Sequence, residues 1–293
     1  MKSGKGSGCI AWSGNRHEIQ AVKVIYAVLL FLFCGLFTAL KQLEVREVTE
    51  IYLAENHLLL ETGYHDPQIH SHSAAHILLG LHGDMRVITE KETILCRGAL
   101  LPSGTAHTVD SFGRPLLVFL LDVTSTVSEQ IQRMAALDRG TAECIALSYR
   151  TLAAGNPADG YEKFFMEVMY LLKMKDSGSR ITDERIIHAM RFAKEYLQDE
   201  VTAVEAARAA CLSESRFSHL FREQAGIAFS SWLVFQKLFD TYIKIAEGVS
   251  ITDASLAAGF STPSHFATVN KKMFGITASD LTSGYCLHRI ADI

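Results

Sequence analysis

Four histidines stand out as residues that could do chemistry together. His70, His72 and His76 follow one another closely, and His107 comes after a Pro-Ser-Gly turn further along the chain. On a strand, residues two apart point to the same face, so we expect His70 and His72 to share one. Neutral imidazole is a good ligand for Zn, Ni, Fe and Cu. These residue types therefore predict a site for a divalent transition metal without choosing among the metals.

The same histidines are compatible with two other roles. They could line a metal-free pocket for a small organic effector, or they could be structural. No separate nucleophile or pair of carboxylates accompanies them, and the nearby acids Asp110 and Asp122 fit turn or strand-end positions better than the position of a general base. We therefore expect a binding site with no required cofactor, and keep a metal-dependent oxygenase or isomerase as the alternative.

The elements that hold these histidines are predicted to be strands. Residues 46–125 consist of short apolar runs broken by turns, such as AHILLGLHGDMRVIT and RPLLVFLLDV, and this spacing predicts a sandwich or barrel. The HxH pair and the PxGxxH turn resemble the cupin fold, in which an HxH, a Glu and a further His bind metal. His76 stands where that family has the Glu. The resemblance implies a cupin-like β-barrel with a metal or an organic effector inside it.

A second set of polar residues lies on predicted helices in the C-terminal third. Residues 206–226 and 251–275 both read as helix-turn-helix units, because Ser213 suits a helix N-cap and Gly259 suits the turn between two helices. Phe217, Leu220 and Phe221 recur with helical spacing and predict a buried face. The opposite faces are polar and are predicted to contact DNA. The candidate contact residues are Glu214, Ser215, Arg216, Ser218, His219, Arg222, Ser261, Thr262, Ser264, His265, Thr268, Lys271 and Lys272.

The patterns LSESRFSHLFREQAG, AGFSTPSHF and FGIT resemble the DNA-binding domain of the AraC/XylS family over about 100 residues. The resemblance implies a sequence-specific transcriptional regulator, more often an activator, that binds double-stranded promoter DNA and acts with RNA polymerase. It also implies a small-molecule or metal effector and a homodimer. Thr268 and Asn270 stand where the family has Arg and Phe, and Ala278 where it has Pro. An amide in place of an aromatic ring costs stability unless it finds hydrogen-bond partners.

The charge balance limits how the chain can bind nucleic acid. Its net charge is −4 and its pI is near 6.3, and residues 180–284 carry 11 Lys or Arg against 12 Asp or Glu. Affinity for DNA comes largely from contacts between cations and phosphates. We therefore expect modest affinity that depends strongly on salt. The acidic balance also supports the alternative of an interaction module that does not bind DNA.

These observations predict an α+β multidomain chain. The predicted parts are an N-terminal extension (1–45), a sensor barrel (46–125), a helical linker or dimerisation region (126–179), a tandem helix-turn-helix domain (180–284) and a tail (285–293). Within them we predict helices over 128–149 and 161–173, a flexible boundary at 175–180, and a rigid connecting helix over 230–248 that begins at a Ser cap.

The N-terminal extension contains an apolar run of 17 residues at 24–40, at the short end of what can span a membrane. Lys and Arg residues precede the run, which would place the remainder of the chain outside the cell, away from DNA. The alternatives are an inverted anchor, a buried helix, or a translated stretch foreign to the natural protein. Six cysteines without paired spacing suggest reduced thiols. We therefore expect a cytoplasmic protein.

Overall fold

The computed structural model describes residues 49–293 except 64–67, 200, 275–276, 280–284 and 291–293. The apolar run at 24–40 lies outside the described residues. Among the described residues, no helix combines the length and the apolar character that crossing a membrane requires.

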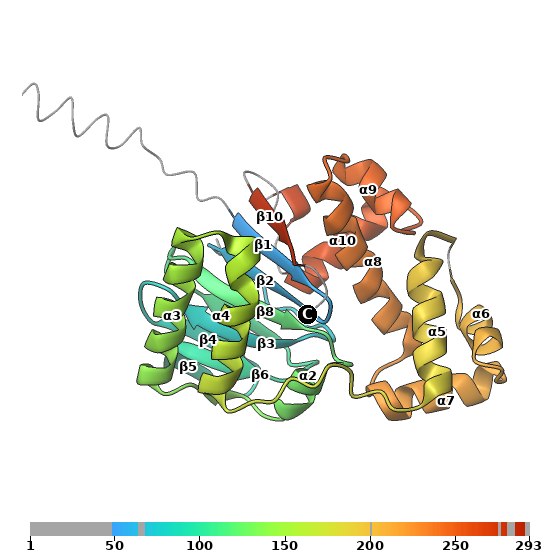
Figure 1. Cartoon of the computed structure of the whole chain (residues 1–293), viewed down its shortest axis with the longest axis horizontal. Coiled ribbons are helices and arrows are strands. Elements are labelled where there is room, and N and C mark those ends of the chain that lie inside the picture. Colours follow the sequence, from blue (N-terminus) through green and yellow to red (C-terminus); the bar gives the residue numbers. More distant parts are fainter. Residues whose placement is uncertain (1–48, 64–67, 200, 275–276, 280–284, 291–293) are drawn as a thin grey trace, which may run out of the picture. The chain divides into compact units, whose positions relative to one another are not determined.

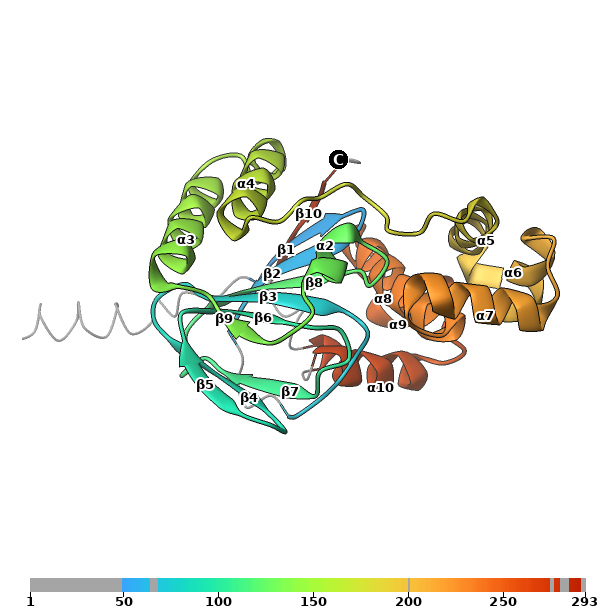
Figure 2. The same ribbon diagram turned by 90° about the horizontal axis from the view of Figure 1, so that it is seen from below.

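Two sheets face each other in the strand-rich domain, which the sequence predicts to be a sensor (Figures 1 and 2). The larger has the strand order β10-β1-β2-β8-β3-β6-β9 and the smaller the order β5-β4-β7. The two sheets remain separate, so the predicted cupin-like barrel is present but open. The strands are β1 (Thr49–Ala54), β2 (His57–Thr62), β3 (Ala75–Gly80), β4 (Met85–Thr89), β5 (Thr93–Cys96), β6 (Gly98–Leu101), β7 (His107–Asp110), β8 (Leu116–Leu121), β9 (Ala135–Ala136) and β10 (Tyr285–Arg289).

The central strands are apolar on both faces because both faces are covered. Every residue of β3 and β8 is buried. Leu78, Val118 and Leu120 belong to the core inside the barrel, whereas Ile77 and Phe119 belong to a second core under two helices. This alternation follows the two-residue period of a strand.

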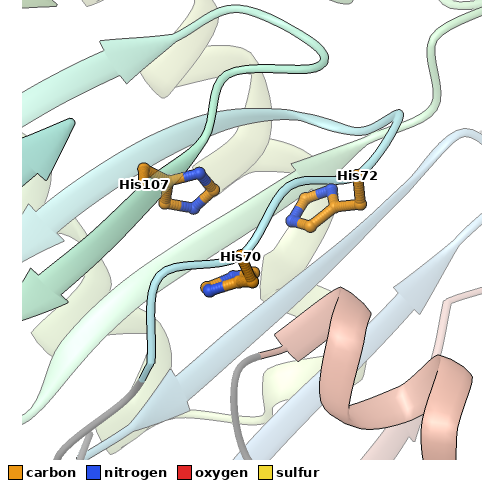
Figure 3. Close-up of side chains that lie close together, drawn as sticks. All are labelled: His70, His72 and His107. Carbon is orange, nitrogen blue, oxygen red and sulfur yellow. The ribbon is translucent and has the colours of Figure 1, made fainter. Parts of the chain in front are cut away.

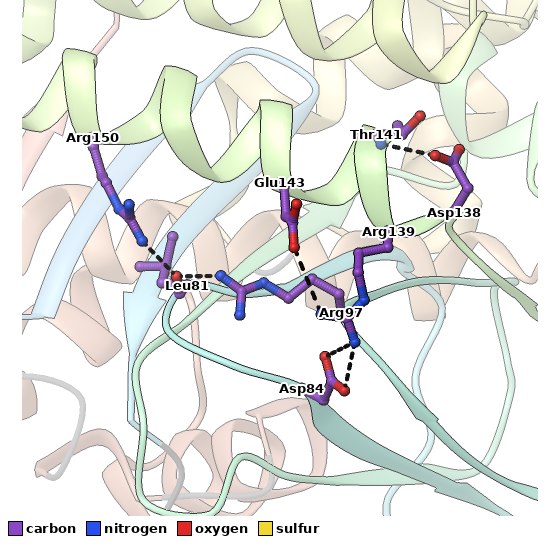
Figure 4. Close-up of polar contacts among 8 residues, drawn as sticks. All are labelled: Leu81, Asp84, Arg97, Asp138, Arg139, Thr141, Glu143 and Arg150. Carbon is purple, nitrogen blue, oxygen red and sulfur yellow. Dashed lines mark hydrogen bonds and ion pairs between the residues drawn. The ribbon is translucent and has the colours of Figure 1, made fainter.

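The two covering helices are α3 (Arg139–Ala154) and α4 (Pro157–Leu172). Figure 2 shows them on the face of the large sheet opposite β4, β5 and β7. Polar contacts fasten α3 to the sheet near both ends of the helix (Figure 4): Arg139 pairs with Asp84 at 2.9 Å, and Arg150 donates to the Leu81 carbonyl at 3.0 Å. The same carbonyl accepts from Arg97 at 2.7 Å.

The helix predicted over 128–149 is wrong in its first half. A short helix, α2 (Thr126–Gln130), ends at Ile131, and the chain then forms β9 before α3 begins. Ile131 is buried in the core under α3 and α4. The Asp138 side chain accepts a hydrogen bond from the Thr141 N–H and so starts a new helix.

The segment 175–180, predicted as a flexible boundary, is hydrogen-bonded to the end of the strand-rich domain and to α2. The Thr126 N–H donates to the Gly178 carbonyl at 2.9 Å, and the Arg180 N–H donates to the Thr124 carbonyl at 2.8 Å. The Gln130 side chain bonds both the N–H and the carbonyl of Lys175. Small polar residues here therefore form a hydrogen-bonded connection, which composition alone did not reveal.

The C-terminal domain contains α5 (Glu184–Glu195), a 3-10 turn (Leu197–Asp199), α6 (Ala203–Ala209), α7 (Glu214–Ala225), α8 (Phe229–Ala246), α9 (Ile251–Ala257) and α10 (Pro263–Phe274). The side chains of Thr202, Ser213 and Ser250 cap α6, α7 and α9. The connecting helix α8 starts after Ala228 and has no side-chain cap, so its predicted start at a Ser cap is wrong.

The segment 285–293, predicted as a tail, supplies a strand. Tyr285–Arg289 forms β10, which pairs in parallel with β1 at the edge of the large sheet. The β1 edge offers unpaired backbone groups, and an extended apolar and aromatic segment can satisfy them.

Candidate functional site

Three of the four predicted histidines converge at one end of the barrel (Figure 3). One ring nitrogen from each of His70, His72 and His107 lies within 4.8 Å of the other two. His70 and His107 form an isolated β-bridge, with backbone hydrogen bonds of 3.0 and 2.9 Å. Neither His70 nor His72 lies in a strand, so the prediction that they share one face of a strand is wrong. Loop pairing brings them together: the Gly104 N–H also donates to the His72 carbonyl at 2.8 Å.

The fourth histidine, His76, lies in β3 beside this group. Its ring centroid is 4.7 Å from that of His72 and 4.6 Å from that of His107. His72 Nε2 and His76 Nδ1 are both buried, and neither has a hydrogen-bond partner among the described residues. Buried polar atoms are usually satisfied, so two orphaned imidazole nitrogens indicate a place for a ligand.

The tautomers of two rings suit metal binding. His70 Nδ1 lies 2.8 Å from the Gln68 carbonyl and His107 Nδ1 lies 2.8 Å from the Thr105 carbonyl. A carbonyl only accepts, so each Nδ1 carries the proton and each Nε2 has a free lone pair. His72 differs, because the Ala74 N–H donates to its Nδ1 at 3.2 Å. A metal at His72 Nε2 would require that contact to break.

Burial keeps the imidazoles neutral. It lowers the pKa of His107 to about 4, and it lowers the pKa of His72 and His76 well below the usual value of 6.5. Burial also lowers the pKa of His70, although the hydrogen bond to the Gln68 carbonyl raises it in part. Neutral rings present lone pairs to a cation and do not repel it.

Two cavities adjoin the histidine loop, and residues of α10 line both. One, of about 490 Å³, is lined by Ser71, His72 and Ser103 from the strand-rich domain and by Val269, Lys272 and Met273 from α10. The other, of about 520 Å³, is lined by Ile69 and His70 together with Thr268, Lys271 and Lys272. The loop that carries His70 and His72 and the helix that carries candidate DNA contacts therefore share these cavities.

The thirteen candidate DNA contacts are all exposed on or beside α7 and α10. On α7, the buried residues are Phe217, Leu220, Phe221 and Ala225, so the polar face points away from the core. The described residues provide no ion-pair partner for Arg216, Arg222, Lys271 or Lys272.

Local hydrogen bonds occupy several hydroxyls near the start of α10. Thr262 Oγ1 accepts from the His265 N–H at 3.0 Å, and Ser261 Oγ lies 3.2 Å from His265 Nδ1. Thr268 Oγ1 donates to the Ser264 carbonyl at 3.0 Å. Thr262 therefore acts as the cap of α10.

Asn270 is the amide that stands in place of an aromatic ring and that was predicted to cost stability without a hydrogen-bond partner. It is fully buried. Its Oδ1 accepts a hydrogen bond of 2.5 Å from the Tyr242 hydroxyl on α8. The Tyr242 ring packs edge-on against Phe266 and Phe274. The buried amide oxygen in the core of the second helix-turn-helix unit therefore has a hydrogen-bond donor. Nothing in the sequence around Tyr242 or Asn270 indicates this pair.

Asp122 also has a role that sequence reasoning missed. It accepts from the Thr124 N–H and hydroxyl, at 2.8 and 2.7 Å, as a residue at a strand end does. Its other oxygen accepts from Gln236 on α8 at 2.9 Å. This bond joins the end of β8 to the helix between the two helix-turn-helix units.

The C-terminal part of the chain is similar in sequence to known proteins. Residues 206–283 match the family model described as a helix-turn-helix domain. The arabinose operon regulatory protein of Escherichia coli strain K12 is 30% identical over 113 residues, which is 38% of each chain. Its counterpart in Salmonella typhimurium strain LT2 is 31% identical over 104 residues, or 35% of this chain and 37% of that protein. The alignments therefore cover less than two-fifths of these relatives.

Solved structures extend the similarity of fold beyond that domain. ToxT from Vibrio cholerae O395 superimposes with a TM-score of 0.52 at 13% identity, over 77% of this chain and 97% of that one. A second ToxT structure, bound to (E)-4-(8-methylnaphthalen-1-yl)but-3-enoic acid, gives a TM-score of 0.51 at 12% identity, over 78% of this chain. At such low identity the likeness shows a shared fold.

Proposed function

We propose that this chain, whose C-terminal domain is an AraC/XylS-type helix-turn-helix domain, is a DNA-binding transcriptional regulator with a ligand-sensing barrel. The observation that carries the proposal is the pair of polar, exposed faces on α7 and α10, within the segment that matches the helix-turn-helix family. The similarity to arabinose operon regulators over the same region supports it.

The two faces suit a single chain that binds two major-groove segments. Arg216 and Arg222 on α7 and Lys271 and Lys272 on α10 supply cations for phosphates or base edges. The connecting helix α8 has 18 residues and therefore spans about 27 Å. That length approaches the roughly 34 Å of one DNA turn.

For the sensor, we propose a divalent transition metal held by His70, His72 and His107. The support is the convergence of three neutral imidazoles, two of which have Nδ1 fixed as a donor. A bound cation would supply positive charge and fixed coordination geometry at the barrel mouth. His70 and His107 fit this role as they stand, and His72 fits it after it releases the Ala74 N–H.

An organic anion in the adjoining cavity is the second candidate effector. The cavity of about 490 Å³ has the volume of a small-ligand site and combines apolar residues with the Lys272 ammonium. The ToxT structure that contains a carboxylic acid shows that a protein of this fold binds such a molecule. His72 Nε2 would then donate to the ligand.

Coupling between sensor and DNA would occur at α10. Thr268, Lys271 and Lys272 are candidate DNA contacts and also line the cavities beside the histidine loop. A ligand that binds differently when α10 lies against this loop and when it is free would shift the balance between the two states.

We further propose a homodimer formed through the outer side of α3 and α4. Leu147, Met166 and Tyr170 are 63%, 62% and 81% exposed there, which is unusual for large apolar side chains on packed helices. Regulation of promoters would place the protein in the cytoplasm, where it would act with RNA polymerase.

The test of the sensor is replacement of both His70 and His72 by Ala, with His82→Ala at an exposed position as the control. We expect Zn²⁺ or Ni²⁺ to change the DNA affinity of the parent and of the control, but not that of the double variant. Circular dichroism should show that the double variant is folded. A normal metal response of the double variant would refute the metal site.

Lys272→Ala tests the organic-anion candidate, with the acid found in ToxT as the probe. An acid response that Lys272→Ala removes, together with no metal response, would move the sensor assignment to the cavity.

A further inference from the structure

A second cluster of potential metal ligands lies at the far edge of the large sheet, where β10 pairs with β1. Glu50 is the register partner of Cys286, and Tyr52 is the partner of His288. Since side chains alternate along a strand, Glu50, Cys286 and His288 share one face of the sheet. One ligand atom from each lies within 4.8 Å of the other two.

The imidazole of this cluster is held in place on two sides. His288 Nε2 lies 2.7 Å from Glu50 Oε2. The His288 ring stacks on Tyr52 with centroids 4.7 Å apart, and Tyr52 in turn is fully buried against Tyr149 and Tyr161. The position of Nε2 is therefore set by a rigid aromatic support.

The charges on this face favour a cation. Glu50 lies directly opposite Glu61 across β1 and β2, and two carboxylates at opposed positions destabilise a sheet. The Tyr149 hydroxyl donates to Glu61 at 2.7 Å, and His288 partners Glu50. These two contacts share the negative charge with neighbours that can donate, but a metal ion would neutralise it more fully.

We propose that Glu50, Cys286 and His288 form a Zn²⁺ site that fastens β10 to β1. Thiolate, imidazole and carboxylate are the ligand types of tetrahedral zinc, and three protein ligands leave one position for water. Zn–S and Zn–N bonds of about 2.3 and 2.0 Å place ligand atoms roughly 3.5 Å apart. The present separations therefore require only small shifts. Binding replaces the proton shared by His288 and Glu50 and releases the Cys286 thiol proton to solvent.

This site is separate from the histidine cluster of the barrel in residues, strands and ligand type. Two of its ligands, Cys286 and His288, follow residues 206–283, the segment that matches the helix-turn-helix family, whereas Glu50 precedes it. Because β10 follows that domain in the chain, Zn²⁺ here would tie the end of the domain to the sensor sheet. This consequence rests on the proposed function, whereas the metal site itself does not.

The test is titration of the reduced, metal-free full chain with Co²⁺, which reports a thiolate ligand by its charge-transfer absorption. In the variant that lacks His70 and His72, from which the other proposed metal site is removed, we expect the band to saturate at one equivalent and to disappear on addition of Zn²⁺. Cys286 is exposed, so Cys286→Ser should leave the fold intact. It should abolish the band and weaken Zn²⁺ binding at this site by at least about 100-fold, since even outer contacts of metal ligands contribute 10- to 100-fold.

Cys144→Ser and Cys211→Ser are the matched controls, because both thiols are exposed and lie elsewhere in the fold. Both should keep the band, and so should the variant that lacks His70 and His72. Hydrogen exchange supplies a second readout: Zn²⁺ should slow exchange of the β10 amides in the parent and not in Cys286→Ser. Absence of the band in the parent, or its persistence in Cys286→Ser, would overturn the site. DNA binding is measured separately, so failure of the Zn²⁺ site would leave the proposed DNA-binding function standing, and failure of DNA binding would leave the Zn²⁺ site standing.

Discussion

Single residues of this protein show how burial changes the chemistry of imidazole. His57 is not part of the candidate ligand site, yet it is as buried as His76 and His107. Its Nε2 is hydrogen-bonded to the Tyr161 hydroxyl at 2.8 Å, and its ring stacks on Phe165 with centroids 4.1 Å apart. Burial lowers its pKa from 6.5 to about 3. The folded protein therefore keeps this ring neutral under conditions in which the unfolded chain protonates it.

This difference predicts a pH dependence of stability. The contribution of His57 is fully present above pH 6.5 and is lost as the pH falls from 6.5 toward 3, because only the unfolded chain takes up the proton in that range. Between pH 7 and 5.5 the loss should be about 1 kcal/mol. Urea unfolding of the parent and of His57→Gln should show a smaller loss in the variant. Equal losses in the two proteins would contradict the assignment, and exposed His82→Gln should behave as the parent.

Arg216 tests the DNA-facing side of α7. It is exposed, its N–H is capped by Ser213, and no described residue forms an ion pair with its side chain. We expect Arg216→Ala to weaken DNA binding and, if the side chain contacts a base, to relax preference at one position by about 1–3 kcal/mol. A uniform loss on all sequences indicates a phosphate contact. The exposed Lys194→Ala on α5 serves as the control, and unchanged binding of Arg216→Ala would refute this docking face.

Among the elements, the turn between α9 and α10 depends on one glycine. Gly259 has φ of +84°, and a Cβ there would lie 2.4 Å from the Leu197 carbonyl oxygen. Gly248 has φ of +89°, and no atom of the described residues lies within 4 Å of such a Cβ. Both Ala variants incur the left-handed backbone cost of about 1–2 kcal/mol.

Gly259→Ala should destabilise the chain by at least about 1 kcal/mol more than Gly248→Ala, because only the former also meets a neighbouring backbone atom. Denaturant unfolding of the two variants measures the difference. Equal destabilisation would show that the close approach of Leu197 to the turn is absent in solution.

Local signals in the sequence were sufficient for the helix-turn-helix units. The Ser213 cap, the apolar face of Phe217 and the Gly259 turn each depend on residues a few positions away, and the structure has all three. The α+β class and the strand-rich domain also follow from such local patterns, whereas the separation of its strands into two sheets does not. The histidines of the candidate ligand site were selected by their type and spacing, although backbone pairing outside the named strands, rather than a shared strand, brings His70 beside His107.

Pairings between distant segments could not be read in the same way. Glu50 and His288 are 238 positions apart. The strand Tyr285–Arg289 forms because β1 offers it an edge, and residues near 285–289 do not indicate that pairing. The end of α2 at Ile131 likewise depends on a distant contact, because the Ile131 side chain is buried in the core under α3 and α4. The Tyr242–Asn270 and Gln236–Asp122 bonds join helices to partners that sequence periodicity does not specify.

At the scale of the whole molecule, the central claim is that one chain both binds specific DNA and responds to a ligand in its barrel. The charge of the C-terminal domain is nearly balanced, so affinity depends on a few exposed cations. Four phosphate contacts would give a slope of about −4 in a plot of log affinity against log salt concentration.

The most direct test is binding of the full chain to its own upstream DNA and to a scrambled sequence across a salt series, with and without Zn²⁺. We expect preference for the upstream DNA, a steep loss of affinity with salt, and a Zn²⁺ effect that the variant lacking His70 and His72 does not show. Equal affinity for the two DNAs at every salt concentration would contradict the central claim.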